Sequence, residues 1–142
     1  MRKIFLILTI IGVTVTKLQA QQTDLQLVET TLNYYLTGLV NNDAKILTKA
    51  FHPTATMKWI SKSEEYKEVN AIAELTEGMN GIPLKDVKTR VVSVNVAGNA
   101  ASAQLEIQFP AFTYIDFMHV LKTDGKWLIV SKIFYTRQEP KS

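Results

Sequence analysis

The chain contains 142 residues, with 16 Lys and Arg, 13 Asp and Glu, and no Cys. The lack of Cys excludes a disulfide framework, a thiolate nucleophile, a Cys-ligated zinc site and a lipid-modified Cys within this sequence. This length is typical of one domain, and it allows a hydrophobic core that needs no disulfides for stability.

The first residues are predicted to form a signal peptide that is removed. Arg2 and Lys3 precede an apolar run at residues 4–15, and cleavage is expected after Ala20. The run is shorter than the roughly 20 residues of a membrane-spanning helix, although an uncleaved anchor helix is the alternative. We therefore expect a periplasmic or secreted protein whose mature domain, residues 21–142, has no membrane association.

Removal of residues 1–20 would also lower the net charge of the protein. Arg2, Lys3 and Lys17 would leave with the signal, which reduces the 16 basic residues to 13, against 13 acidic residues. The mature net charge is then near zero. The basic balance of the whole chain is therefore no sign of nucleic-acid binding, and no nucleic-acid partner is expected.

The mature chain begins with a pattern that predicts two helices. Apolar residues recur at helical spacing from Asp24 to Val40, and Thr23 precedes them as an N-cap. A second, shorter helix is predicted to begin at a cap formed by Asn42 or Asp43 and to run to Phe51.

The rest of the chain combines one more helix with several strands. Alternation of apolar and polar residues, interrupted by Gly, Asn and Pro, predicts the strands. The expected elements are strands at 55–60 and 66–69, a helix at 70–79, and strands at 84–96, 101–109 and within the hairpin 112–135. Helices gathered ahead of a run of antiparallel strands predict an α+β fold with the helices on one face of the sheet.

Asp116, in the terminal hairpin, is the strongest polar candidate for a functional residue because it lies within an apolar strand. A three-residue turn, Thr123–Gly125, would put Asp116 directly opposite Lys132. Such a facing pair of opposite charges contributes about 0.2–1 kcal/mol, and a structural pair is the preferred interpretation. A two-residue turn, Asp124-Gly125, would instead place Asp116 opposite Ile133 and turn Lys132 to the other face.

The strand at 101–109 places Gln104, Glu106 and Gln108 on one face. The preferred interpretation is a solvated outer face or the wet part of a dimer interface. In the alternative, the stripe points into the fold, Glu106 becomes a buried acid with a raised pKa, and Arg90 meets it from the neighbouring strand. In the strand at 84–96, one side is expected to carry Arg90, Val92, Val94 and Val96.

Two stretches resemble the nuclear transport factor 2-like superfamily, which includes ketosteroid isomerase and the SnoaL-like proteins. They are YYLTGLVNNDAKILTKAFHPTATM, ending at Met57, and DGKWLIVSKIF at Asp124–Phe134. The run YIDFMHVLKTDGKWLIVSKIF is most similar to the exported group labelled "putative lumazine-binding". The resemblance implies a cone-shaped, curved antiparallel sheet wrapped around a long N-terminal helix with two shorter helices, a cystatin-like α+β roll. It also implies an apolar pocket at the open end and an outer sheet face that pairs two subunits into a homodimer.

The resemblance to ketosteroid isomerase implies two catalytic positions. In that enzyme the catalytic base is an Asp on the first strand, and a Tyr of the first helix helps to hold the developing oxyanion. Counted from the acidic turn at Asp43, Tyr35 falls at the Tyr position and Trp59 at the base position. Trp cannot accept a proton from carbon, so the chain departs from the isomerase pattern.

The aromatic residues suggest a pocket for a flat ligand. Mostly apolar walls with a few polar tips suit a small hydrophobic or aromatic molecule, and no cofactor is expected. The predicted ligand-binding residues are Tyr35, Met57, Trp59, Ile72 and Met79. The alternative for these side chains is simple packing in the core.

The two His residues give no metal-site signature, because HxH, HxxxH and acidic clusters are all missing from the sequence. His119 is expected on a packed or interfacial face with Phe117 and Leu121. His52 is expected to lie at a helix end, where a cation meets the helix dipole favourably.

Three functions are compatible with these features, and the first is favoured. The first is an exported small-molecule-binding domain without catalysis. The second is an enzyme of the isomerase, dehydratase or cyclase kind, with Asp116 or Glu106 as base and Tyr35 as hydrogen-bond donor. The third is a dimeric interaction module whose outer sheet face binds a partner protein and whose cone is filled.

Overall fold

A computed structural model of the chain describes residues 22–140. The predicted signal peptide and its cleavage site after Ala20 lie outside this range. Among the described residues, no helix combines the length and the apolar character that a membrane span requires.

The described residues form three helices and six strands, in the order predicted from the sequence. They are α1 (Asp24–Val40), α2 (Ala44–Thr48), β1 (Phe51–Ile60), β2 (Tyr66–Asn70), α3 (Ala71–Thr76), β3 (Lys88–Ala97), β4 (Ala100–Gln108), β5 (Phe112–Thr123) and β6 (Lys126–Gln138). The strands make one sheet in the order β2-β1-β6-β5-β4-β3. All neighbours are antiparallel except β1 and β6, which are parallel.

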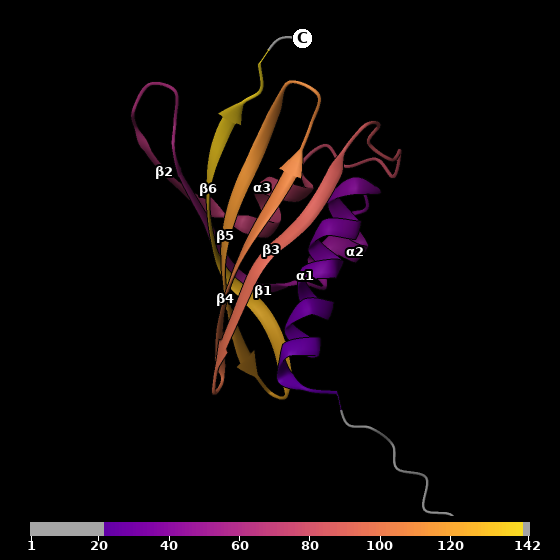
Figure 1. Cartoon of the computed structure of the whole chain (residues 1–142), viewed down its shortest axis with the longest axis vertical. Helices are drawn as coiled ribbons and strands as arrows, with labels where there is room; N and C mark the ends of the chain where they lie inside the picture. Colours follow the sequence, from indigo (N-terminus) through magenta and orange to yellow (C-terminus); the bar gives the residue numbers. More distant parts are fainter. Residues whose placement is uncertain (1–21, 141–142) are drawn as a thin grey trace, which may run out of the picture.

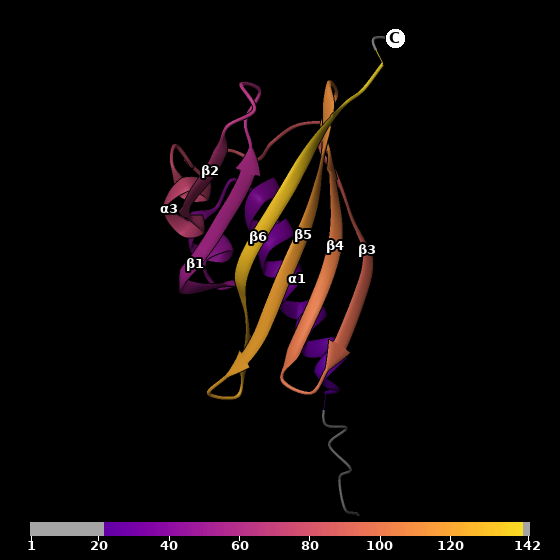
Figure 2. The same cartoon turned by 90° about the vertical axis from the view of Figure 1, so that its left-hand side faces the viewer.

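The sheet is curved and unclosed, and it holds α1 against its inner face. Figure 2 shows β6, β5, β4 and β3 side by side in front of α1. Turned by 90°, the hairpin of β1 and β2 flares away from α1 at the upper end (Figure 1). The fold is therefore α+β and cone-shaped, as predicted. This arrangement gives the sheet an inner face, covered by the helices, and an outer face that is not.

The first helix is fixed at its N-terminal end and packs on the sheet through a buried stripe. A capping box joins Thr23 to Gln26, and the buried face includes Val28, Leu32 and Tyr35. At the lower end of the molecule, Asp24 accepts hydrogen bonds from Lys122 Nζ (2.7 Å) and Trp127 Nε1 (3.0 Å), next to the turn of the last hairpin. Both hydrogen bonds hold the pKa of the Asp24 carboxyl below its usual value. The sequence pattern of spaced apolar residues thus acts as expected for an amphipathic helix.

The contact between α1 and α2 depends on Gly38. A β-carbon at this position would lie 2.4 Å from the backbone nitrogen of Leu47. Real side chains do not tolerate so short a distance, so the two backbones approach as closely as they do only because residue 38 is glycine. The approach buries Leu47 fully in the core.

The strand after α2 begins earlier than the sequence predicts. The second helix ends at Thr48 rather than Phe51, and β1 begins at Phe51 rather than Ala55. The reason is a long-range pairing, since Ile129 N donates to Ala50 O (2.8 Å) and Phe51 pairs with Ile129 of β6. His52 therefore lies in a strand, and its predicted role at a helix end is wrong.

The segment between α3 and β3 also differs from the prediction. The helix ends at Thr76 rather than Met79, and β3 begins at Lys88 rather than Leu84. Backbone hydrogen bonds from Gly81 N to Asn42 O (2.9 Å) and from Leu84 N to Val40 O (2.8 Å) tie the intervening loop to the end of α1. These contacts replace the strand pairing that the alternating pattern suggested.

An irregularity in β3 overturns the expected alternation of that strand. The pairing passes from Val91–Leu105 to Ser93–Gln104, so Val92 is the extra residue of a bulge. Val92 is exposed, whereas Val94 packs against the core. The two valines therefore do not share one side, because a bulge shifts every later side chain to the opposite face.

A second irregularity determines the register of the last hairpin. The turn consists of Asp124 and Gly125 with φ of 49° and 75°, and Thr123 pairs with Lys126. The preferred three-residue turn was wrong, because the two-residue turn with both φ positive suits the twist of paired strands. Further along, Val120 pairs with Ile129 but His119 pairs with Ser131, so one residue of β6 is bulged between them. This extra residue is Val130.

Candidate functional site

A buried polar network lies between α1 and the inner face of the sheet. The carboxylate of Asp116, from β5, is fully buried and accepts two hydrogen bonds. Tyr35 Oη of α1 donates to Oδ2 at 2.7 Å, and Lys132 Nζ of β6 donates to Oδ1 at 2.5 Å. Three elements far apart in the sequence therefore converge on one carboxylate.

Burial changes the pKa of the two side chains that donate to Asp116. Burial raises the pKa of Tyr35 well above its ordinary value, and the nearby charge of Asp116 adds to the effect. The phenol is thus a fixed hydrogen-bond donor. Burial lowers the pKa of Lys132, while the contact with Asp116 acts in the opposite direction. In residues 22–140, every buried side-chain nitrogen and oxygen has a hydrogen-bond partner, as a low-dielectric interior requires.

The bulge at Val130 brings Lys132 to this network. Asp116 pairs with Phe134, and Met118 pairs with Lys132. All four side chains lie on the inner face, so Lys132 reaches Asp116 diagonally along the strand. Without the extra residue, the two-residue turn would turn Lys132 outward.

Above the network, five aromatic side chains form a continuous surface that we call the aromatic wall. Its members are Trp59, Phe109, Phe112, Tyr114 and Phe134, and each is partly exposed. Phe134 lies between Trp59 and Tyr114, with ring centroids 5.6 Å from the first and 5.5 Å from the second. Phe109 and Phe112 stack at 4.7 Å and both contact Tyr114.

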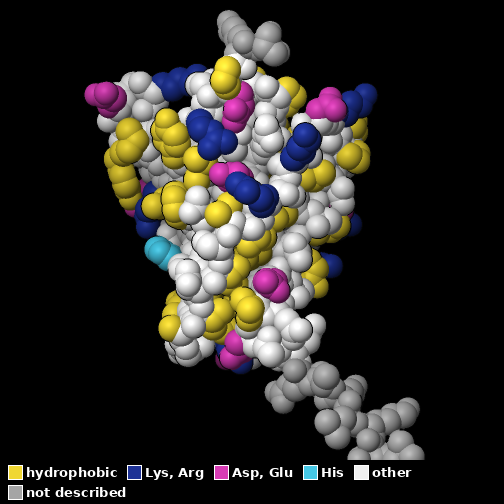
Figure 3. Space-filling model, viewed as in Figure 1, with side chains coloured by type: hydrophobic (Ala, Val, Ile, Leu, Met, Phe, Trp, Pro, Cys, Tyr) yellow, Lys and Arg dark blue, Asp and Glu magenta, His cyan; other side chains and the backbone are white. Residues whose placement is uncertain are grey.

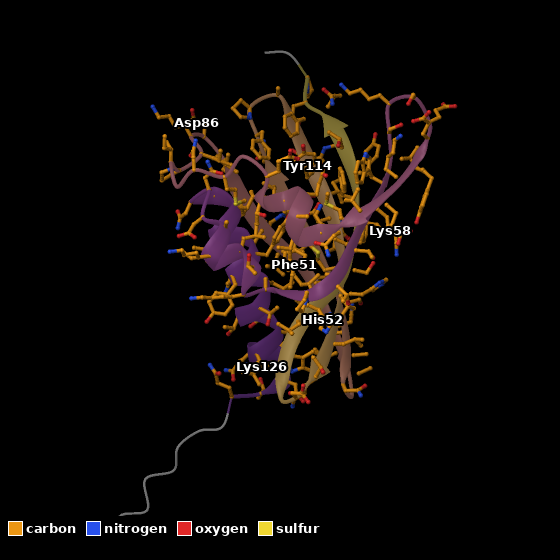
Figure 4. The ribbon with its side chains drawn as sticks, turned by 180° about the vertical axis from the view of Figure 1, so that it is seen from behind. Phe51, His52, Lys58, Asp86, Tyr114 and Lys126 are labelled. Atoms are coloured by element: carbon orange, nitrogen blue, oxygen red, sulfur yellow. The ribbon has the colours of Figure 1, made fainter. Side chains whose placement is uncertain are left out.

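The wall rests directly on the buried network. Lys132 Nζ lies 4.1 Å from the centre of the Phe134 ring and 6.0 Å from that of Tyr114. Burial raises the pKa of the Tyr114 phenol, and the charge of Asp116 contributes. Figure 4 places Tyr114 in the upper half of the molecule, above Phe51. The wall therefore lies toward the wider, upper end of the cone.

The predicted pocket residues are only partly brought together. Tyr35 and Met57 are buried in the core, whereas Trp59, Ile72 and Met79 are partly buried around it. Two surface hollows in the described part of the chain are lined by none of these five residues. One, of about 310 Å³, lies beside α1 and α2. The other, of about 830 Å³, lies between the loop before β3, the β4–β5 turn and residues 139–140.

Glu106 lies away from the network, on the outer face of the sheet. Its Oε2 contacts Arg90 Nη2 at 2.5 Å, and its Oε1 lies 3.9 Å from Arg137 Nη1. Its neighbours in sequence, Leu105 and Ile107, are the fully buried residues of this strand. The inward alternative for Glu106 therefore fails. His119 is also exposed on this outer face.

The outer face carries an apolar surface that we call the outer patch: Ile115, Phe117, Ile133 and Tyr135. Phe117 pairs with Ile133, and Ile115 pairs with Tyr135 across the neighbouring strands. Phe117, Ile133 and Tyr135 are 42%, 46% and 63% exposed. Such a cluster on a sheet face is an unusual surface for an isolated domain.

Charge is mixed on the face seen in Figure 3. Lys, Arg, Asp and Glu side chains are interspersed there over the upper half of the molecule. This face therefore presents no field of one sign of the kind that attracts nucleic acids. Within residues 22–140, no group of three His, Asp or Glu side chains is placed to hold a metal ion.

Of the wall, the sequence analysis predicted only Trp59 as a binding residue and missed Phe109, Phe112, Tyr114 and Phe134. The available signal was the spacing of Phe112, Tyr114 and Asp116, which puts aromatic rings and a carboxylate on one face of a strand. Phe134 could not be added to that face from the sequence, because its direction depends on the bulge at Val130.

Comparison with known families shows to which family the chain belongs. The family described as "Putative lumazine-binding" matches residues 23–135, so the protein belongs to this family. Its fold is that of the nuclear transport factor 2-like superfamily. A search of curated protein sequences found no match.

Solved structures support the same placement. An NTF2-like protein of unknown function from Shewanella baltica OS155 is 27% identical, with a TM-score of 0.73, over 85% of this chain and 100% of its own. A ketosteroid isomerase-like protein from Erwinia carotovora atroseptica SCRI1043 is 12% identical, with a TM-score of 0.64, over 85% of this chain and 100% of its own. The association domain of CaMKII from C. elegans is 16% identical, with a TM-score of 0.58, over 78% of this chain and 92% of its own. The last two likenesses concern the fold alone.

Proposed function

We propose that this domain binds a small, flat organic molecule on the aromatic wall and does not transform it. The observation that carries the proposal is a row of partly exposed rings, Trp59, Phe134 and Tyr114, on the inner side of the cone. Offset and edge-to-face contacts with such rings favour planar ligands. The family description names lumazine, a planar bicyclic heteroaromatic compound, and is consistent with this class of ligand.

The buried carboxylate is not placed to act as a catalytic base. Both oxygens of Asp116 accept hydrogen bonds, and the carboxylate is fully buried beneath Lys132 and the wall. A general base must come within hydrogen-bond reach of the proton it removes. The Tyr35 hydroxyl already donates to Asp116, so it is not free to hold an oxyanion. Glu106 faces the other side of the sheet.

Titration calorimetry with two probes, lumazine and 2-naphthol, tests the binding. The wild-type protein is expected to bind at least one probe, and Trp59→Ala is expected to weaken that binding by about tenfold. Tyr135→Ala, a matched aromatic change in the outer patch, should leave the affinity unchanged. Failure of the wild-type protein to bind either probe would count against the proposal, as would equal effects of the two variants.

We propose in addition that the outer patch joins two copies of the chain into a homodimer. The patch combines three exposed apolar side chains with the polar rim of Arg90, Glu106 and Arg137. An apolar centre with a polar rim is the usual anatomy of a protein interface. The association domain among the similar folds is named for assembly, and this is compatible with pairing through the sheet. An interaction module would use the same surface.

We also propose that the protein is exported, from the N-terminal pattern described above. Intact-mass measurement of protein recovered from the periplasm or culture medium is the test. The measured mass is expected to match a chain that begins at Gln21. A full-length chain in the cell membrane would support the uncleaved anchor instead.

A further inference from the structure

We infer that the buried ion pair of Asp116 and Lys132 serves to position Phe134, the ring that joins Trp59 to the rest of the aromatic wall. The inference rests on the proposed function, because it assigns the network to the same binding surface. Lys132 is thus a positioning residue, which acts on a ligand through Phe134.

The contacts run without a gap from the first helix to the wall. Tyr35 Oη holds one carboxylate oxygen of Asp116 at 2.7 Å, and Lys132 Nζ is held by the other at 2.5 Å. The same ammonium lies 4.1 Å from the centre of the Phe134 ring. A cation at this distance is attracted to the face of an aromatic ring and favours one orientation of it.

Phe134 is the ring that connects Trp59 to the other members of the wall. It alone contacts both Trp59, at 5.6 Å with planes 32° apart, and Tyr114, at 5.5 Å with planes 83° apart. A rotation of Phe134 would break both arrangements. The ammonium below Phe134 limits that rotation because it attracts the face of the ring. Apolar side chains in its place would not favour the face over the edge.

Stability alone does not explain why the pair is present. Replacing a buried ion pair by apolar residues of similar size is often neutral or stabilising. Lys132 also reaches the inner face only because Val130 is bulged, and bulges commonly redirect a side chain next to a functional site. The bulge at Val130 and the pair with Asp116 together place the Lys132 ammonium against the ring of Phe134.

The test removes the whole network at once, so that no buried charge or hydroxyl loses its partner. The triple variant Tyr35→Phe/Asp116→Leu/Lys132→Met is expected to melt at the wild-type temperature or above. Its nuclear Overhauser contacts between the Phe134 and Trp59 rings should weaken, and its affinity for lumazine or 2-naphthol should fall about tenfold. Lys132→Arg keeps a cation beneath the ring and should preserve both the ring contacts and the affinity.

The matched control is Lys58→Met, which removes the lysine of a partly exposed pair with Glu68 (3.7 Å) on the neighbouring strands. It should change neither readout. A triple variant with unchanged ring contacts would overturn the inference while the proposed function stands. A triple variant that does not fold would also overturn it, because the network would then be needed for stability. A wild-type protein that binds neither probe would contradict the proposed function, and the ring contacts would still decide the positioning role.

Discussion

Lys132 contacts Asp116 along a diagonal of the β5–β6 ladder. Their Nζ and Oδ1 atoms are 2.5 Å apart, although Lys132 faces Met118 and Asp116 faces Phe134. This offset places the ammonium between the carboxylate and the ring of Phe134, and one cation therefore serves both. A directly facing pair would hold the charges together but leave the ring without its cation.

Removing the cation alone should destabilise the protein strongly. Lys132→Met leaves the carboxylate of Asp116 buried with only Tyr35 as donor, and breaking one side of a buried pair typically costs about 3–5 kcal/mol. Urea unfolding at neutral pH measures the change. Lys58→Met is the control, and its partly exposed pair with Glu68 should contribute less than about 1 kcal/mol. A loss for Lys132→Met no larger than that of the control would show that the buried carboxylate does not depend on Lys132.

The phenol of Tyr35 should ionise at a higher pH than that of an ordinary tyrosine. Its pKa is raised in the folded state, so the contribution of this group to stability is complete below pH 10 and is lost as the pH rises further. The Tyr35→Phe variant has no such group. The wild-type protein should therefore lose more unfolding free energy than Tyr35→Phe as the pH is raised above 10. Parallel declines in the two proteins would contradict the raised pKa.

The phenolate absorbance gives a second measurement of the same group. In a spectrophotometric titration of the folded protein, Tyr35→Phe should remove amplitude from the most alkaline part of the curve. Loss of amplitude near pH 10 instead would mean that the hydroxyl of Tyr35 is accessible to solvent.

Any side chain at residue 38 should separate the first two helices. Gly38→Ala puts a methyl group into the backbone of Leu47, and overpacking of this kind costs about 1–3 kcal/mol or more. Thermal unfolding measures the loss. Thr37→Ala changes the neighbouring exposed position of the same helix and should be close to neutral. Equal effects of the two substitutions would contradict the close approach of the helices.

A charge in the outer patch should prevent dimer formation. Ile133→Glu would bury an unpaired carboxylate at the centre of the proposed interface, which is costly. Light scattering after size exclusion should show a dimer for the wild-type protein and a monomer for this variant. Ile60→Glu is the control, because Ile60 is 64% exposed but lies on the β1–β2 hairpin outside the patch. A wild-type monomer, or a variant that stays dimeric, would contradict the proposal.

The sequence is sufficient to predict the class of fold because the signals for it are local. Helical spacing from Asp24 to Val40 and alternation in the strand at 101–109 each depend on a few neighbouring residues. The early start of β1 at Phe51 was not predictable in the same way. It depends on a parallel pairing with Ile129, a partner almost 80 positions away.

The site was predicted less well because its geometry depends on two bulges. Asp116 and Lys132 were paired from an assumed three-residue turn, whereas the contact arises from a two-residue turn combined with the bulge at Val130. A single extra residue reverses the face of every later side chain. The direction of Phe134, and with it the aromatic wall, was therefore beyond the reach of local pattern.

A nuclear magnetic resonance titration of the folded protein with lumazine tests whether the aromatic wall binds a ligand. The Trp59 indole resonance and the ring resonances of Phe134 and Tyr114 are expected to shift and saturate together. Resonances of the outer patch, such as those of Phe117 and Tyr135, should stay in place. Shifts confined to the outer patch, or no shifts with either lumazine or 2-naphthol, would contradict the claim that the aromatic wall is a ligand-binding surface.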